Sequence, residues 1–362
     1  MKGSFKLGSI AGIGVFIHWT FAILIAYIIF SDYRAGYHTM QIMWTLIFIL
    51  SIFVTVFLHE LGHALAAKRY HIKTKDITIL PIGGLARLER IPENPKEEFI
   101  VAIAGPAVNI FLAAITALFI NIPDVNILTA QLSGGVNYNN FFLNFFVVNI
   151  FLALFNLIPA FPMDGGRVLR ALLATKFERH IATNIAARIG QFLAIGFVFV
   201  GFFYNPFLIF IGLFIFIGAQ AEVEFTLAKT VLKEFKVSDV LMRNYQTIES
   251  SETIKTAVDI LLNGQCKNFL VTHNSLAAGT LSRNEIIKAL SEQGESTIVG
   301  TIMNRELIYL DANLPLEEAY QLIQQSKTSL MPVLQNNILI GTLDTENILE
   351  FIMIIDAQKN RK

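Results

Sequence analysis

His59, Glu60 and His63 form the spacing His-Glu-x-x-His near the end of a long apolar stretch. Residues four apart share one face of a helix, so both imidazoles can bind the same metal ion. The glutamate, one position on, can accept a proton from a water that the metal activates. The spacing therefore predicts a zinc site with a general base, and hydrolysis is the chemistry that such a site performs.

The position of this motif favours function over chance, although the same spacing also recurs by chance on surface helices. It follows the apolar run 42–58, where ionisable side chains are expensive and are usually functional. Lys68 follows His59 by nine residues, which places the histidine roughly 14 Å along the helix from its basic end. The motif is therefore expected inside a membrane span, near one end.

A catalytic zinc normally takes three protein ligands and keeps one position open. Asp164 is the strongest candidate for the third ligand, because Pro159 and Pro162 interrupt the apolar stretch just before it. Prolines break a helix, and the opened backbone could aim the carboxylate at the metal. The alternative is an aspartate that merely favours a helix-breaking turn.

The composition indicates a membrane protein with a soluble second half. Hydrophobic residues make up 54% of the 362 residues and charged residues 15%, against about 25% in soluble proteins. The formal net charge is zero, so the overall charge of the protein does not favour binding to nucleic acid. A membrane helix needs roughly 20 apolar residues. Six stretches qualify or come close: 12–30, 41–67, 99–120, 140–173, 183–203 and 205–224.

Positive charge gives the direction of these spans, because Lys and Arg gather on the cytosolic side. The segment 68–98 is rich in both, Arg167 and Arg170 mark the end of the fourth stretch, and segment 121–139 has neither. The N-terminus and the C-terminal region are therefore expected in the cytosol, in a cytoplasmic membrane. The second and fourth spans run the same way, so His59, His63 and Asp164 come to similar depth.

The region after about residue 236 repeats itself with an offset of 61 to 62 residues. The segments 237–242 and 279–282 recur as 299–303 and 341–344, and each copy has a helical pattern followed by a short apolar strand. A unit used twice is a paired module. The whole chain has a single cysteine, Cys266, so no disulfide can form within it.

The repeat resembles a tandem of CBS domains, the modules named after cystathionine β-synthase. That resemblance implies adenine-nucleotide binding and pairing into a homodimer. Glu285 and Asn347 stand where the family usually has the aspartate that holds the ribose. A structural or dimerising module without nucleotide is the alternative.

Over nearly its whole length the chain resembles the site-2 proteases that carry C-terminal CBS domains. That family pairs His-Glu-x-x-His with an Asn/Asp-x-x-Asp-Gly type motif, here His59, Glu60, His63 and Asp164. The resemblance implies one zinc ion per chain and regulated cleavage of single-span membrane proteins within or near their transmembrane segment. The expected fold is a polytopic α-helical membrane domain of about six spans followed by a soluble α/β CBS pair. The domain boundaries expected are 1–228, 229–295 and 296–362.

Three further features match the same family. The segment 81–86 resembles a strand whose edge pairs with an unwound substrate, and Gly83 and Gly84 would let a second backbone approach. Asn156 resembles a polar residue that donates a hydrogen bond to the scissile carbonyl or developing oxyanion. The segment 104–109 could serve the substrate or close helix packing. An ordinary turn and a packing asparagine are the alternatives for the first two.

Two other classes of function compete with the protease. One is a non-catalytic metal-handling or transport membrane protein gated by the CBS pair, and the other is a membrane scaffold. The spans show no evident inverted repeat of the kind found in many transporters. Glu60 also favours catalysis, because a metal-binding site needs no base.

Overall fold

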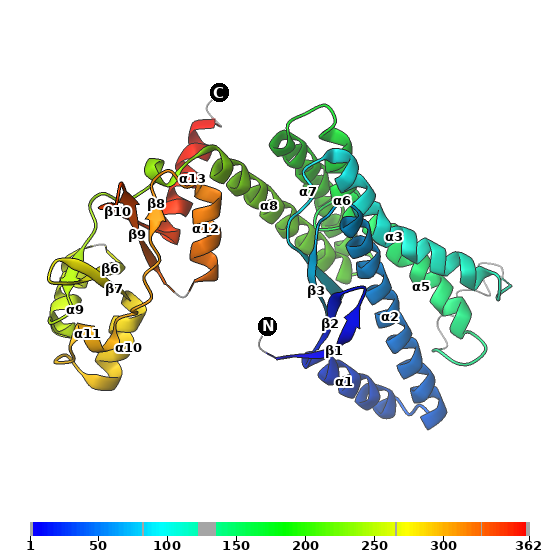
Figure 1. The fold of residues 1–362 in the computed structure, drawn as a ribbon. Coiled ribbons are helices and arrows are strands. Elements are labelled where there is room, and N and C mark those ends of the chain that lie inside the picture. The colour runs from blue at the N-terminus through cyan, green and yellow to red at the C-terminus, as the bar shows by residue number, and fades with distance from the viewer. Residues whose placement is uncertain (1–2, 82, 122–134, 265, 327, 360–362) are drawn as a thin grey trace. The chain divides into compact units, whose positions relative to one another are not determined.

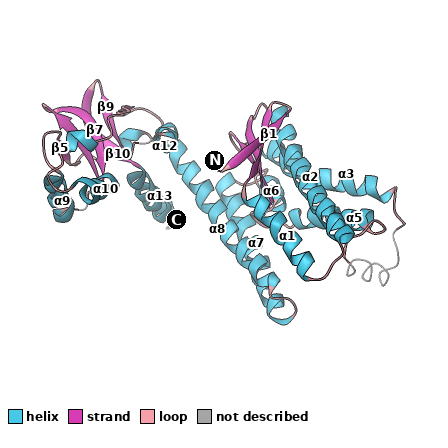
Figure 2. Cartoon of the chain, turned by 90° about the horizontal axis from the view of Figure 1, so that it is seen from below, coloured by secondary structure: helices cyan, strands magenta, loops and turns pink. Residues whose placement is uncertain are grey.

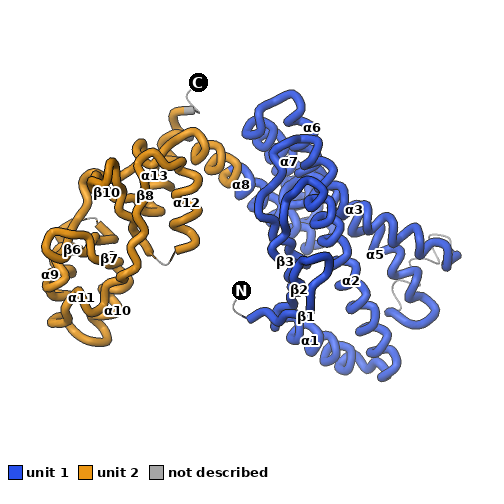
Figure 3. The backbone as a smooth tube through the Cα atoms, in the orientation of Figure 1, with its two compact units in different colours: residues 1–223 blue, residues 224–362 orange. Residues whose placement is uncertain are grey.

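The computed structural model describes residues 3–81, 83–121, 135–264, 266–326 and 328–359 (Figure 1). Two compact units divide the chain, residues 1–223 and residues 224–362 (Figure 3). Most of the segment 121–139, which carries no Lys or Arg, lies outside the described residues.

Unit 1 combines a small β-sheet with a set of helices (Figure 2). Its elements are, in chain order, β1 (Ser4–Ile10), β2 (Ile13–His18), α1 (Thr20–Arg34), α2 (Thr39–Arg69), β3 (Thr74–Leu80), β4 (Gly83–Leu88), α3 (Pro95–Ala117), α5 (Phe141–Asn156), α6 (Asp164–Leu173), α7 (Arg179–Phe203) and α8 (Phe207–Glu234), the last of which continues into unit 2.

The membrane-type helices of unit 1 agree with the predicted polytopic organisation. Among the described residues, four helices are long and apolar enough to cross a membrane: α2, α3, α7 and α8. The helices α1 and α5 are shorter, with 15 and 16 residues. Each of the six predicted stretches overlaps one of these helices.

The start of the first predicted span, residues 12–30, is wrong. Residues 13–18 form β2, and the helix begins only at Thr20. Ala11 and Gly12 both have positive φ, 54° and 87°, which is the geometry of a tight two-residue hairpin turn. A short apolar run cannot tell a buried strand from a helix, and here the turn decides the outcome.

The sheet of unit 1 has the strand order β1-β2-β3-β4, so β4 is an edge strand. β2 and β3 are parallel, and the other two pairs are antiparallel. Ile13 of β2 and Ile77 of β3 pack with Ala64 of α2 in one buried cluster. The sheet therefore covers the face of α2 next to the His-Glu-x-x-His motif.

Helix α3 approaches α2 closely at Gly62. A Cβ atom on Gly62 would lie 2.8 Å from Val108 Cγ2 and 2.9 Å from the carbonyl oxygen of Ala104. Such contact between backbones is the usual role of small residues at helix interfaces in membranes. The segment 104–109 thus packs against the motif helix.

The fourth predicted stretch, residues 140–173, is interrupted as its prolines indicate. Helix α5 ends at Asn156 and α6 begins at Asp164, and residues 157–163 between them are irregular. Irregular backbone at membrane depth must lie against protein. Ala160 and Phe161 of this segment are fully buried, in clusters that include Ala194 of α7 and Ala219 of α8.

Unit 2 contains two copies of one α/β motif. Its elements after α8 are η1 (Val237–Asp239), β5 (Thr247–Glu249), α9 (Ile254–Asn263), β6 (Asn268–His273), β7 (Leu276–Ser282), α10 (Arg283–Gln293), α11 (Val299–Ile302), β8 (Leu310–Asp311), α12 (Leu316–Gln325), β9 (Leu330–Gln335), β10 (Ile338–Asp344) and α13 (Thr345–Lys359).

The two copies contact each other through bridges that are spaced as the sequence repeat is. In each, a parallel strand pair is followed by an antiparallel one: β5-β6-β7 and β8-β9-β10. Met242 of the first copy forms a β-bridge with Thr342 of the second, and Asn304 of the second forms one with Thr280 of the first. Both members of one bridge lie 62 residues from their counterparts in the other. The predicted paired module is confirmed.

Candidate metal centre

The two histidines of the motif lie four residues apart on α2 and are both buried. The exposed fractions are 7% for His59 and 6% for His63. Their Nε2 atoms lie 3.1 Å apart. Two nitrogen donors at this distance, facing the same point, are the first part of a metal site.

Asp164 brings the third donor from the far side of the irregular segment. It is the first residue of α6, and its side chain is buried. Its Oδ2 atom lies 3.2 Å from His59 Nε2 and 3.1 Å from His63 Nε2. The three donor atoms all lie within 4.8 Å of one another, although Asp164 is 101 residues from the nearer histidine.

The outer nitrogens of the two imidazoles are held by acceptors on α3. His59 Nδ1 donates to Asn109 Oδ1 at 2.5 Å, and His63 Nδ1 donates to the carbonyl oxygen of Val101 at 2.7 Å. A proton on Nδ1 leaves a lone pair on Nε2. Metal-binding histidines are usually oriented by such a hydrogen bond.

Gly105 of α3 lies directly against the two imidazoles, where a larger residue would collide with both of them. A Cβ atom on Gly105 would lie 2.2 Å from His63 Nε2 and 2.5 Å from His59 Nε2. Zinc binds histidine nitrogen at about 2.0–2.1 Å, and a His₂-carboxylate set leaves a fourth position open. The donor types, their convergence and the tautomers therefore fit a catalytic zinc ion.

Glu60 is next to this group and faces the sheet. Its Oε2 atom accepts a hydrogen bond from the backbone N–H of Ala86 on β4, at 3.1 Å. A Cβ atom on Gly84 would lie 2.6 Å from Glu60 Cγ, so only glycine lets β4 come this close. Gly83, with a φ of 140°, also has a conformation that favours glycine.

Asn156, the residue predicted to stabilise the oxyanion, has its amide hydrogen-bonded within α5. It is the last residue of α5, and its Nδ2 donates to the carbonyl oxygen of Leu152, one turn earlier, at 2.9 Å. The amide is thus used within its own helix in this conformation.

The sequence reasoning missed the two groups that orient the histidines. A backbone carbonyl such as that of Val101 leaves no signal in a sequence. Asn109 does leave one, because it is a polar side chain in an apolar helix, and it is fully buried. Its Nδ2 points to Asn149 of α5 at 3.5 Å, which extends the polar path from the centre.

Comparison with protein families and known proteins identifies both halves of the chain. The model of peptidase family M50 matches residues 47–139 and 125–197, which include all three metal donors. The CBS domain model matches residues 237–292 and 299–354.

Individual relatives agree with the family models. A zinc metalloprotease of Methanocaldococcus jannaschii is 34% identical over 289 residues, 80% of each chain. A candidate zinc metalloprotease of Synechocystis sp. is 28% identical, over 97% of this chain and 96% of its own. The solved site-2 protease of M. jannaschii is 35% identical, over 61% of this chain and 95% of its own, with a TM-score of 0.42.

A methyl group at Gly105 should exclude the metal. We expect Gly105→Ala to lose bound zinc, because the added carbon would occupy the space between the two Nε2 atoms. Gly196→Ala is the matched control, since a Cβ atom on that α7 glycine meets open space. Zinc per chain can be measured by mass spectrometry of the purified proteins. Full zinc in Gly105→Ala would show that the metal lies elsewhere.

Proposed function

Because the chain belongs to peptidase family M50, the family of the site-2 proteases, and ends in a tandem CBS pair, we propose that it cleaves single-span membrane proteins within or near their transmembrane segment. It is a zinc metalloprotease by family and a multi-pass membrane protein by its apolar helices. The observation that carries the proposal is the buried convergence of two imidazoles and one carboxylate beside a glutamate.

In this proposal His59, His63 and Asp164 hold one zinc ion per chain. The bound zinc would polarise the scissile carbonyl and activate a water molecule. Glu60 would accept the proton of the attacking water and return it to the leaving nitrogen. Asn109 and Val101 keep the Nε2 lone pairs directed at the ion, and the buried surroundings strengthen every charge interaction in the site.

The substrate is proposed to bind along the free edge of β4. Because Ala86 directs its N–H away from β3 and toward Glu60, the same edge can offer backbone groups to an extended peptide. A helical substrate would have to unwind first, since a helix hides its peptide bonds. Gly83 and Gly84 leave room for the second backbone. Asn156 would contribute to the oxyanion only after releasing the Leu152 carbonyl.

We further propose a cytoplasmic-membrane location with the N-terminus and both CBS domains in the cytosol. The support is the distribution of Lys and Arg, which are frequent in residues 68–98 and absent from residues 121–139. Water would then reach the zinc from the cytosolic side. Dimerisation through the CBS pair belongs to the same proposal.

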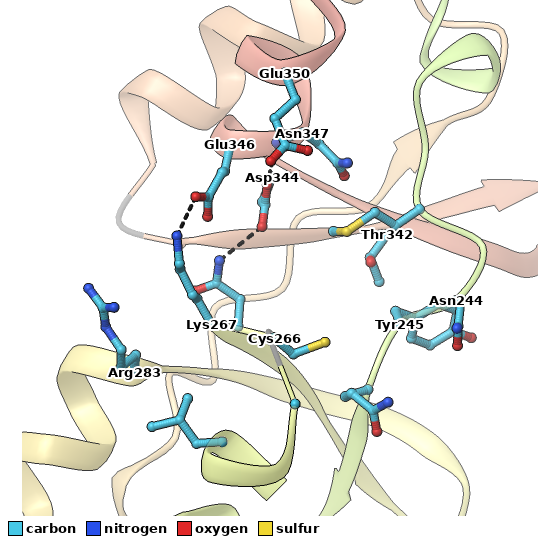
Figure 4. Close-up of a pocket in the computed structure, with 15 residues that line it drawn as sticks. Asn244, Tyr245, Cys266, Lys267, Arg283, Thr342, Asp344, Glu346, Asn347 and Glu350 are labelled. Carbon is cyan, nitrogen blue, oxygen red and sulfur yellow. Dashed lines mark hydrogen bonds and ion pairs between the residues drawn. The ribbon is translucent and has the colours of Figure 1, made fainter.

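A pocket between the two CBS repeats supports a second proposal, that the pair binds an adenine nucleotide. It has a volume of about 540 Å³ and is lined by both repeats (Figure 4). Within the described residues, Thr342 Oγ1 and Asn347 Oδ1 are buried there without hydrogen-bond partners. Buried polar atoms are rarely left unpaired, so a polar ligand would account for both.

Other polar groups of this pocket are already paired. Asn268 Nδ2 donates to Asp344 Oδ2 at 3.0 Å, and Lys267 pairs with Glu346 across the two repeats. Arg283 also lines the pocket (Figure 4). Glu285, which takes the place of the family's usual aspartate, is used by the helix cap at Ser282. The ribose contact would therefore fall to Asn347.

Replacing Glu60 by Gln should separate metal binding from catalysis. We expect Glu60→Gln to keep its zinc, because the three ligands are intact, and to lose cleavage by about 10²–10⁴-fold, the usual contribution of a general base. Quantitative proteomics of membrane fractions from native cells would show uncut single-span proteins accumulating in this variant. Glu89→Gln, an exposed residue just after β4, is the control. Normal cleavage in Glu60→Gln would contradict the protease, and metal flux into its vesicles would favour a transporter.

Nucleotide binding is tested on the full-length protein in detergent. Millimolar AMP or ATP should raise the melting temperature, because a ligand that binds only the folded state stabilises it. Thr342→Val should reduce the shift, and Thr301→Val, on α11 outside the pocket, should not. No shift with either nucleotide would favour a structural or dimerising CBS pair.

A further inference from the structure

Arg170 carries the largest fully buried side chain in the described part of the chain. Its Nε and Nη2 atoms donate to Glu98 Oε1 of α3 at 2.8 and 2.6 Å. Its Nη1 pairs with Glu222 of α8. The guanidinium also lies over the ring of Phe161, 5.0 Å from its centre. We call Arg170 with Glu98 and Glu222 the arginine clamp.

Arg179 completes the charge balance of the clamp from α7. Its Nη1 atom lies 3.0 Å from Glu98 Oε2 and donates to the carbonyl oxygen of Pro92 at 2.9 Å. Two cations thus face two carboxylates, and four helices, α3, α6, α7 and α8, meet at one point. Burying so many charges in an apolar domain is expensive, so such a cluster calls for a reason.

Stability alone does not supply that reason. Apolar residues of similar volume often stabilise a core as well as a buried ion pair does, because the charges must first lose their hydration. Apolar side chains, however, let helices slide past one another. Here Nε and Nη2 of Arg170 converge on one oxygen of Glu98 while Nη1 holds Glu222, so one planar guanidinium joins α6 to both α3 and α8 in a defined orientation.

The clamp lies on the same short helix as the third metal donor. Helix α6 has ten residues, so it is about 15 Å long, and Arg170 follows Asp164 by six residues. The Asp164 end is confined by the irregular segment: a Cβ atom on Gly165 would lie 2.2 Å from the carbonyl oxygen of Ile158. With one end confined, the clamp at the other end determines the tilt of α6, and hence the position of the Asp164 carboxylate.

We propose that Arg170, held between Glu98 and Glu222, is the positioning residue for the metal ligand Asp164, and that the clamp makes zinc affinity depend on the register of α8. This rests on the proposed zinc site. Helix α8 is continuous from Phe207 to Glu234, and its late residues Val231 and Leu232 belong to the core of unit 2. A shift of α8 would therefore move Glu222 and, through Arg170, would move α6 and its metal donor Asp164.

The test is the apparent Kd for Zn²⁺ of the full-length protein, measured by competition with a chelator. Glu222→Gln should raise this Kd at least about tenfold, the lower range for residues that orient metal ligands. Arg170→Lys should raise it as well, because lysine keeps the charge and loses the planar fork. Glu97→Gln, one residue from Glu98 and outside the clamp, should keep the wild-type Kd. Melting temperatures measured alongside separate loss of fold from loss of metal.

An unchanged Kd in both Glu222→Gln and Arg170→Lys would overturn the positioning role. So would a lower melting temperature with an unchanged Kd, because it would make the clamp purely structural. Two other results would instead contradict the proposed zinc site itself: a wild-type protein that binds no zinc, or an Asp164→Ala protein with wild-type zinc affinity. Failure of the zinc site is thereby distinguished from failure of the positioning role.

Discussion

The convergence of His59, His63 and Asp164 is the arrangement on which the rest of unit 1 depends. A membrane domain offers little water to satisfy polar groups, so each one must find its partner in the protein. The imidazoles are buried on one face of α2, and the carboxylate arrives from α6, more than 100 residues later. Each imidazole finds an acceptor for its Nδ1 on α3, and the missing side chain of Gly105 lets α3 lie close to both rings. Together these contacts direct both Nε2 atoms toward the Asp164 carboxylate.

The departures from regular helix gather around this site. The irregular segment 157–163 lets α6 start at the depth of the motif, and small residues of α7 and α8 cover it. The edge strand β4 brings a row of backbone groups next to Glu60, with Gly84 as the point of closest approach. The proposed general base and the strand proposed to bind an extended peptide thus lie on adjoining elements. The arginine clamp anchors the opposite end of α6.

The ligand residues could be predicted because two independent signals agree on them. The His-Glu-x-x-His spacing defines a helix face, and the distribution of Lys and Arg gives the depth and direction of the second and fourth spans. The repeat in unit 2 could also be predicted from the sequence, because its strands and helices recur at one residue offset in the two copies. The β1–β2 hairpin was not, because the run 13–18 is as apolar as a membrane helix. Arg170 reads in the sequence as a cytosolic positive charge, and only the structure shows that it is buried against Glu98. Contacts between distant helices, such as His59 with Asn109, need the fold.

The proposed centre holds one zinc ion by two imidazoles and one carboxylate. X-ray absorption at the zinc edge of the purified protein tests it most directly, because it reports the atoms bound to the metal. We expect one zinc per chain, with two imidazole nitrogens and further oxygen at about 2.0–2.2 Å from the metal and no sulfur. A zinc–sulfur distance of about 2.3 Å, which would implicate Cys266, or a single imidazole, would contradict it.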